Sequence, residues 1–222
     1  MGAATGQSLP IAVGVLVSPL PIVAVVLMLT SGRARANATA FLLGWFLAVG
    51  VVALGVALLA GTAAGGSSGP PAWLGWAKLA LGVLLLVAAA RQWRARPAEG
   101  AEPAMPRWMT TIDSFTPVRA LGLAVLLSVV NPKNLLLVVS GAAAIAGATD
   151  DPAAKAGAAV VFAVVASLGV AAPVAVYVLT GDRATALLDG LKSWLTHNNT
   201  AVMAVLLLVL GAKMIGDGIS AL

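Results

Sequence analysis

The chain has 222 residues, of which 60% are hydrophobic and only 9% are charged, and its mean hydropathy is +1.01. This composition excludes an ordinary soluble domain, where about a quarter of residues are charged, and the long apolar blocks indicate an integral membrane protein. With no cysteine, one histidine and a net charge of +5 carried by scattered loop residues, we expect no disulfide, no metal, no other cofactor and no nucleic-acid partner.

Six apolar segments are long enough to cross a bilayer as helices, for which about 20 residues suffice. They are residues 9–29, 38–59, 72–90, 118–148, 153–179 and 201–219. Capping residues stand before three of them: Asn37 before the second, Asp151-Pro152 before the fifth, and His197-Asn198-Asn199-Thr200 before the sixth. The sequence therefore predicts an all-α membrane protein with six transmembrane helices in a single domain, residues 1–222.

The basic residues predict the orientation, because short cytoplasmic loops carry an excess of lysine and arginine. Most of the basic residues lie in the loops after the first, third and fifth spans. The second and fourth loops together contain only one, Lys155. We therefore expect the odd-numbered loops in the cytoplasm and both termini on the outer side.

The third loop, residues 91–116, is the only long polar segment. Trp108, Ile112 and Phe115 within it follow helical spacing, which is typical of a short helix lying in the headgroup region. The alternative is a loop that packs beneath the transmembrane helices.

Two polar segments with proline interrupt the first and fourth spans: Ser18-Pro19-Leu20-Pro21 and Asn131-Pro132-Lys133-Asn134. Proline cannot continue a helix, because it lacks an N–H and its ring clashes with the preceding turn. Each break opens a set of three spans, residues 1–90 and 117–222, and an odd number of spans inverts the second set. Inverted repeats with broken helices at matching places are typical of transporters with a midplane site. Chance pairing of two prolines is the alternative.

Lys133 is the central candidate for substrate binding. It lies where a helix restarts, and the positive end of that helix favours anions. Apart from Asp217 near the end of the sixth, no Asp or Glu lies inside a predicted span, so Lys133 must reach water, bind an anion or lose its proton. We expect it to reach water and to bind an anion, with help from Asn131, Asn134 and Ser18. Pro19, Pro21 and Pro132 would form the breaks and hinges. The alternative is that Lys133 only braces the kink.

Other charged residues have weaker interpretations. Lys78 and Lys213 either reach the membrane surface with their long side chains or continue a positive path outward. Asp217 lies one helical turn from Lys213 and is a candidate partner for it. Arg33 and Arg35 either anchor the topology or hold an acidic headgroup at the entrance.

Several of these features together resemble the LysE superfamily of exporters, and most closely its GAP branch, which includes the actinobacterial sulfolipid-1-addressing proteins. They are Ser18-Pro19-Leu20-Pro21, Gly32-Arg33-Ala34-Arg35, Phe41 with Gly44, the long third loop with Pro106 and Trp108, and Asn131-Pro132-Lys133-Asn134. The resemblance implies six spans in a bacterial cytoplasmic membrane. It also implies export of glycolipids or peptidoglycolipids, or of amino acids or ions in the wider superfamily. Leu20 replaces the glycine of the Pro-Gly-Pro typical of amino-acid exporters.

We therefore expect a secondary exporter, not an enzyme, that moves an anionic amphiphile or lipid-linked envelope component by alternating access. One alternative is a small-solute exporter of the same fold, with a small anionic substrate. Another is a non-transporting scaffold subunit that binds an envelope-lipid synthase or an exporter partner through residues 91–116. Association into a homo-oligomer is left open.

Overall fold

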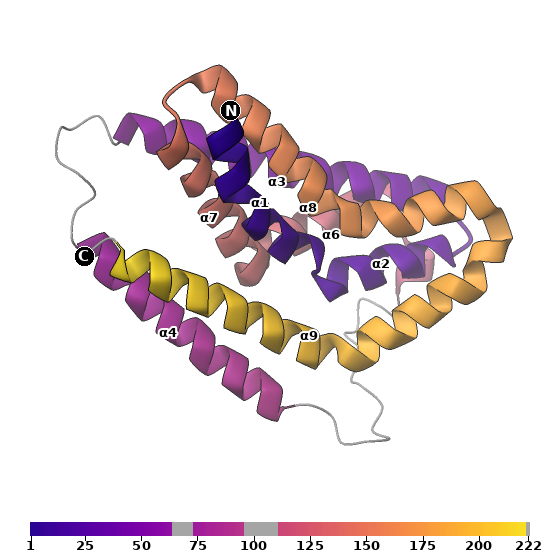
Figure 1. Ribbon diagram of the computed structural model, residues 1–222. Coiled ribbons are helices and arrows are strands. Elements are labelled where there is room, and N and C mark those ends of the chain that lie inside the picture. The colour runs from indigo at the N-terminus through magenta and orange to yellow at the C-terminus, as the bar shows by residue number, and fades with distance from the viewer. Residues whose placement is uncertain (64–72, 96–110, 221–222) are drawn as a thin grey trace. The chain divides into compact units, whose positions relative to one another are not determined.

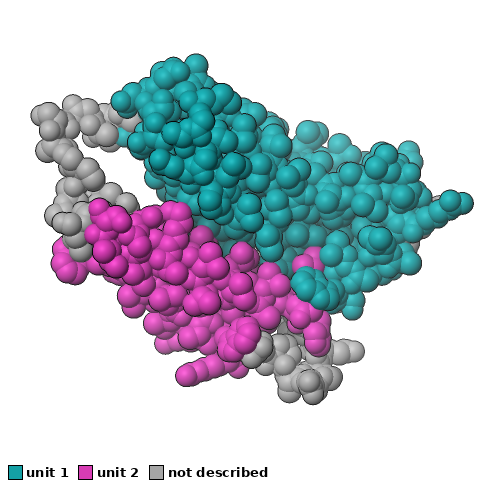
Figure 2. All heavy atoms as spheres, viewed as in Figure 1, with its two compact units in different colours: residues 1–63, 105–194 teal, residues 64–104, 195–222 magenta. Residues whose placement is uncertain are grey.

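The computed structural model describes residues 1–63, 73–95 and 111–220, and within these ranges the chain is helical, with no strand (Figure 1). The chain divides into two compact units, shown in different colours in Figure 2. The larger unit contains residues 1–63 and 105–194, and the smaller unit contains residues 64–104 and 195–222.

The elements have the following bounds. In the larger unit they are α1 (Gly2–Leu16), α2 (Pro19–Leu29), α3 (Ala34–Ala63), the 3-10 helix η1 (Ile112–Ser114), α6 (Pro117–Val125), the π-helix η2 (Leu126–Val130), α7 (Pro132–Ala148), α8 (Pro152–Thr180) and the 3-10 helix η3 (Gly181–Ala184). The smaller unit contains α4 (Trp73–Arg94) and the later part of α9 (Thr185–Ile219), whose first ten residues belong to the larger unit. The third helix of each expected three-helix half thus contributes to the smaller unit.

Helix α3 packs against α6, α7 and α8, and α1 packs against α7 and α8. The largest buried side chains of the core, Phe41 and Trp45, lie on α3 with their rings stacked at 6.3 Å between centroids. The indole N–H of Trp45 donates to the carbonyl oxygen of Ala166 on α8 at 3.3 Å. This bond satisfies a polar group that would be costly to leave unpaired in an apolar interior.

Glycines allow two pairs of these helices to approach closely. A Cβ added to Gly44 on α3 would lie 3.0 Å from the carbonyl oxygen of Leu121 on α6. One added to Gly169 on α8 would collide with the carbonyl oxygen of Leu16, at the end of α1. Small residues at helix contacts are typical of membrane proteins, because they let backbones meet without a hydrophobic driving force.

Three helical segments are long and apolar enough to cross a membrane: Ala34–Ala60, Pro152–Thr180 and Ala186–Ile219. Two further spans result if each bent pair counts as one, and both bends lie at the predicted prolines. Gly2–Leu16 meets Pro19–Leu29 at 55°, and Pro117–Val130 meets Pro132–Ala148 at 66°. The chain is thus a multi-pass helical membrane protein, as predicted. The third predicted span, residues 72–90, whose described part lies on α4, stays a prediction, as does the inverted repeat.

The predicted helix starts are right in one place and wrong in two. Asp151 caps α8, since its carboxylate accepts from the backbone N–H groups of Ala153 at 3.1 Å and Ala154 at 3.2 Å. Asn37 is not a cap, because α3 already begins at Ala34 and the buried amide of Asn37 instead donates to a distant carbonyl. The polar stretch 197–200 lies inside α9, which runs unbroken from Thr185, so polar residues with capping preference do not start a helix there.

The headgroup-region helix expected in the third loop falls partly outside the described residues, which exclude Trp108. Within them, Ile112 begins the short 3-10 helix η1 and is buried, with 2% of its surface exposed. Helix η1 contacts α2, and the carbonyl oxygen of Phe115 accepts the side-chain N–H of Asn37 at 2.9 Å. For this end of the loop, the contacts favour the alternative of a segment packed against the helices.

Candidate functional site

The two helix breaks have nearly the same backbone geometry. Ser18 has φ −65° and ψ 113°, and Asn131 has φ −66° and ψ 117°. Both residues precede a proline, which disfavours the helical region for the residue before it and drives that residue into extended backbone. Each proline then takes the first position of the following helix, where its missing N–H costs nothing.

The second break begins before its proline, in the five-residue π-helix η2. The backbone N–H of Asn131 closes this π-turn by donating to the carbonyl oxygen of Leu126 at 2.9 Å. Pro132 has no N–H for the freed carbonyl groups, and the side chain of Asn134 donates to one of them, that of Leu127, at 2.8 Å. Asn131 caps α7, its side-chain oxygen accepting from the backbone N–H of Lys133 at 3.1 Å. Both asparagines therefore satisfy backbone groups that the proline leaves unpaired.

Side chains from the two breaks meet directly. The hydroxyl of Ser18 donates to Oδ1 of Asn134 at 2.8 Å and accepts from Nζ of Lys133 at 2.9 Å. Ser18 and Asn134 are buried, with 3% and 1% of their surfaces exposed, while Lys133 is half-buried. We call these three residues the Ser18–Lys133–Asn134 cluster. It joins segments separated by more than a hundred residues.

The remaining predicted site residues lie around this cluster or apart from it. Pro19 and Pro21 are buried in α2, and Pro132 is exposed at the start of α7. Asn131 is half-buried beside Pro132. Of the other basic residues, Arg33 and Arg35 are exposed at the start of α3. Lys213 forms an ion pair with Asp217 at 2.5 Å in the smaller unit. The side chain of Lys78 lies outside the described residues. The predicted pairing of Lys213 with Asp217 is confirmed.

The cluster has the chemistry of an anion site. An ammonium group lies beside the first turns of two helices, α2 and α7, and helix N-termini carry a partial positive charge. The Ser18 hydroxyl and the Lys133 backbone N–H already donate to Asn134 and Asn131, so the Lys133 ammonium group is the donor that a phosphate, sulfate or carboxylate would accept from. In the described part of the chain, no three His, Asp or Glu side chains lie close enough to hold a metal ion.

Two residues near the cluster are not apparent from the sequence. Ser128 is fully buried in η2 and donates to the carbonyl oxygen of Val125 at 3.2 Å, inside the π-helix. Gly169 on α8 lies against the end of α1, directly before Ser18. The serine three residues before Asn-Pro is only a weak sequence signal for this π-helix. Single π-turns inside helices often occur at functional sites.

A family model described as "Sap, sulfolipid-1-addressing protein" matches residues 9–220, which is nearly the whole chain. No curated protein and no solved structure matches it. The match confirms the predicted resemblance to this branch, while the relation to the LysE superfamily stays a prediction.

Proposed function

Because the chain belongs to the Sap, sulfolipid-1-addressing protein family, we propose that it exports an anionic, lipid-linked component from the cytoplasmic membrane toward the cell envelope. The family supplies a role in lipid addressing or export. The proposed site for the acidic headgroup is the Ser18–Lys133–Asn134 cluster. The observation that carries this proposal is the hydrogen bond between Lys133 and Ser18, which brings a cation and both helix breaks to one point.

A cation inside a membrane span needs compensation. Insertion scales put the cost of a lysine at the centre of a transmembrane helix at about 2.5–3.5 kcal/mol. The Ser18 hydroxyl is a neutral acceptor for the ammonium group. A sulfate, phosphate or carboxylate headgroup would offset more of this cost, because hydrogen bonds between charged groups are roughly twice as strong as neutral ones.

In the proposed mechanism, an oxygen of the headgroup replaces the Ser18 hydroxyl as the acceptor for Lys133. Ser18 and Asn134 keep their own hydrogen bond, so the exchange leaves neither of these polar groups unpaired. Ser18 lies in the first bent span, and Lys133 and Asn134 lie in the second. The headgroup therefore replaces one of the two hydrogen bonds that join the breaks and leaves the bond between Ser18 and Asn134 in place. Rocking of one bent span against the other would then expose the site to each side of the membrane in turn.

The test is mass spectrometry of lipids that co-purify with the protein in mild detergent. The variant is Lys133→Met, which is shorter than lysine by one heavy atom, keeps an unbranched side chain and removes the charge. We expect a defined anionic lipid in the wild type, a loss of at least about tenfold in Lys133→Met, and partial retention in Lys133→Arg. The matched control is Lys213→Met, which removes a cation from the smaller unit and should leave that lipid unchanged.

The proposal is wrong if folded Lys133→Met, checked by circular dichroism and gel filtration, retains the same anionic lipid as the wild type. A lipid that is lost equally from Lys133→Met and Lys213→Met would also contradict it, because the binding would then depend on net charge alone.

A further inference from the structure

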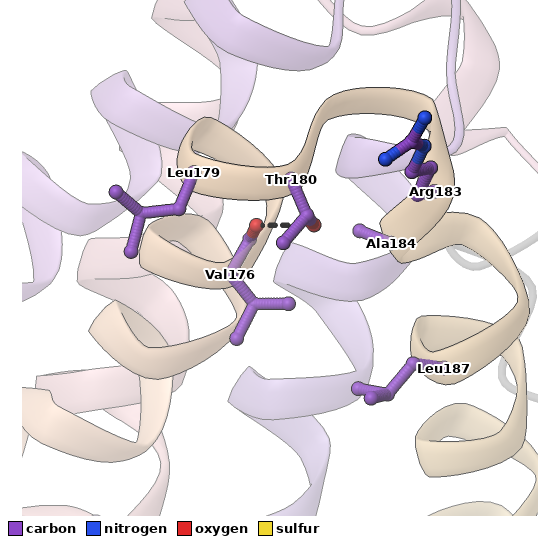
Figure 3. Close-up of a pocket in the computed structure, with 6 residues that line it drawn as sticks. All are labelled: Val176, Leu179, Thr180, Arg183, Ala184 and Leu187. Carbon is purple, nitrogen blue, oxygen red and sulfur yellow. Dashed lines mark hydrogen bonds between the residues drawn. The ribbon is translucent and has the colours of Figure 1, made fainter.

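A second polar feature lies at the corner where α8 ends and α9 begins. An open pocket of about 350 Å³ is lined there by residues that all belong to the larger unit (Figure 3). Its lining consists of Val176, Leu179, Thr180, Arg183, Ala184 and Leu187. The corner is separate in the sequence from both helix breaks, and the proposed export mechanism does not use it.

The backbone at this corner explains the shape of the pocket. Gly181 ends α8 with φ 59°, a left-handed conformation that glycine adopts without strain, and its N–H donates to the carbonyl oxygen of Tyr177. The short 3-10 helix η3 follows and leads directly into α9. The chain thus changes direction within a few residues (Figure 1), and residues from the last turn of α8 and from the first turn of α9 line the pocket together.

The polar groups of the lining are not equivalent. The hydroxyl of Thr180 donates to the carbonyl oxygen of Val176 in its own helix at 2.7 Å, the contact drawn in Figure 3. Arg183, by contrast, is exposed, and no hydrogen bond or ion pair to a described residue holds its guanidinium group. Figure 3 shows this group at one edge of the hollow, with Val176 and Leu187 at the other.

The apolar part of the lining is open to the surroundings. Leu179 and Leu187 are 82% and 61% exposed, which for a chain with membrane spans places apolar side chains where lipid tails can cover them. A guanidinium group binds phosphate oxygens in a bidentate geometry, so the pocket combines a phosphate-binding edge with an apolar one. Arg183 lies in the loop after the fifth predicted span. The charge distribution predicts this loop on the cytoplasmic side, where anionic lipids concentrate.

We propose that this corner binds an anionic phospholipid of the surrounding bilayer. Its phosphate pairs with Arg183, and its acyl chains lie along Leu179 and Leu187. The occupant is a resident membrane lipid, not the exported substrate, and it holds the α8–α9 corner at the membrane surface.

The test is native mass spectrometry of the purified protein titrated with phosphatidylglycerol, with phosphatidylcholine and with inorganic phosphate. All measurements are made in the wild type and in the Lys133→Met background, so that lipid at the Ser18–Lys133–Asn134 cluster is not counted. The test variant is Arg183→Gln. Its matched control is Arg119→Gln, which removes an exposed arginine from the same unit but outside the pocket.

We expect phosphatidylglycerol to bind in preference to phosphatidylcholine, to survive Lys133→Met, and to fall by about fivefold in Arg183→Gln. Arg119→Gln should match the wild type, and Arg183→Lys, which keeps the charge, should retain most of the binding.

Equal binding of phosphatidylglycerol by Arg183→Gln and the wild type would overturn the proposal. Displacement of the lipid by millimolar inorganic phosphate would also overturn it, since the pocket would then recognise the anion without the acyl chains. Loss of all phosphatidylglycerol in Lys133→Met alone would assign the lipid to the cluster instead.

Discussion

Gly169 provides the sharpest test of how the first helix break is held. It lies on α8, and a Cβ built on it would collide with the backbone carbonyl oxygen of Leu16 and lie 3.3 Å from Cδ1 of Ile22. These two residues flank the break on either side. A carbonyl oxygen cannot rotate away as a side chain can, so in Gly169→Ala either α8 or the α1–α2 break must shift.

The expected cost follows from two opposing effects. Overpacking of a well-filled interior costs about 1–3 kcal/mol, and a backbone obstacle places this site in the upper half of that range. Replacing glycine by alanine inside a helix returns about 1 kcal/mol through helix propensity. We therefore expect Gly169→Ala to lose about 1–2 kcal/mol of unfolding free energy.

The measurement is thermal unfolding in detergent, followed by circular dichroism at 222 nm (the helical band). At about 2–4 °C per kcal/mol for a chain of this length, the Tm should fall by about 2–8 °C. The control is Gly50→Ala on α3, where the added Cβ would lie 3.6 Å from the Cβ of Ala163, an ordinary contact. Its Tm should equal or exceed that of the wild type. A Gly169→Ala protein as stable as Gly50→Ala would refute the close approach of α8 to the break.

Two further substitutions test the polar contacts. Asn134→Ala removes the acceptor of the Ser18 hydroxyl and the side-chain donor to the carbonyl oxygen of Leu127. It should lower the unfolding free energy by about 1–3 kcal/mol, measured by denaturant titration, whereas Ser140→Ala on the same helix should not. Equal stability of the two variants would count against these bonds. Asp151→Ala removes the cap of α8 and should lower the unfolding free energy by about 1 kcal/mol in the same assay. The control is Asp150→Ala, and a similar loss in that variant would indicate an effect of charge instead of capping.

The features that the sequence predicts correctly are those that local chemistry determines. Ser18 and Asn131 break their helices because each precedes a proline, and this restriction acts within two residues. The cap at Asp151 is equally local, since its carboxylate reaches N–H groups two and three residues ahead. The apolar spans follow from composition, which depends on no contact between helices.

The features that the sequence leaves open depend on contacts between distant segments. Asn37 has the composition of a cap, but its partner is the carbonyl oxygen of Phe115, 78 residues further along the chain. Residues 197–200 favour a helix start in isolation, yet such preferences amount to less than about 1 kcal/mol per residue, and α9 continues through them. The π-helix η2 extends the second break toward its N-terminal side, where no proline signals it.

The hydrogen bond between Lys133 and Ser18 belongs to this second class, and it bears most directly on function. Each break alone provides only a helix start. The first break holds the acceptor, Ser18, and the second holds the cation, Lys133. Their meeting creates a contact between an ammonium group and a neutral hydroxyl, of a kind worth about 1.5–3 kcal/mol. An ionised headgroup oxygen is a stronger acceptor than a hydroxyl and can displace it. Under the proposed function, the substrate therefore replaces one of the two hydrogen bonds that join the bent spans. Binding loosens the contact between the breaks, while the bond between Ser18 and Asn134 still holds them together.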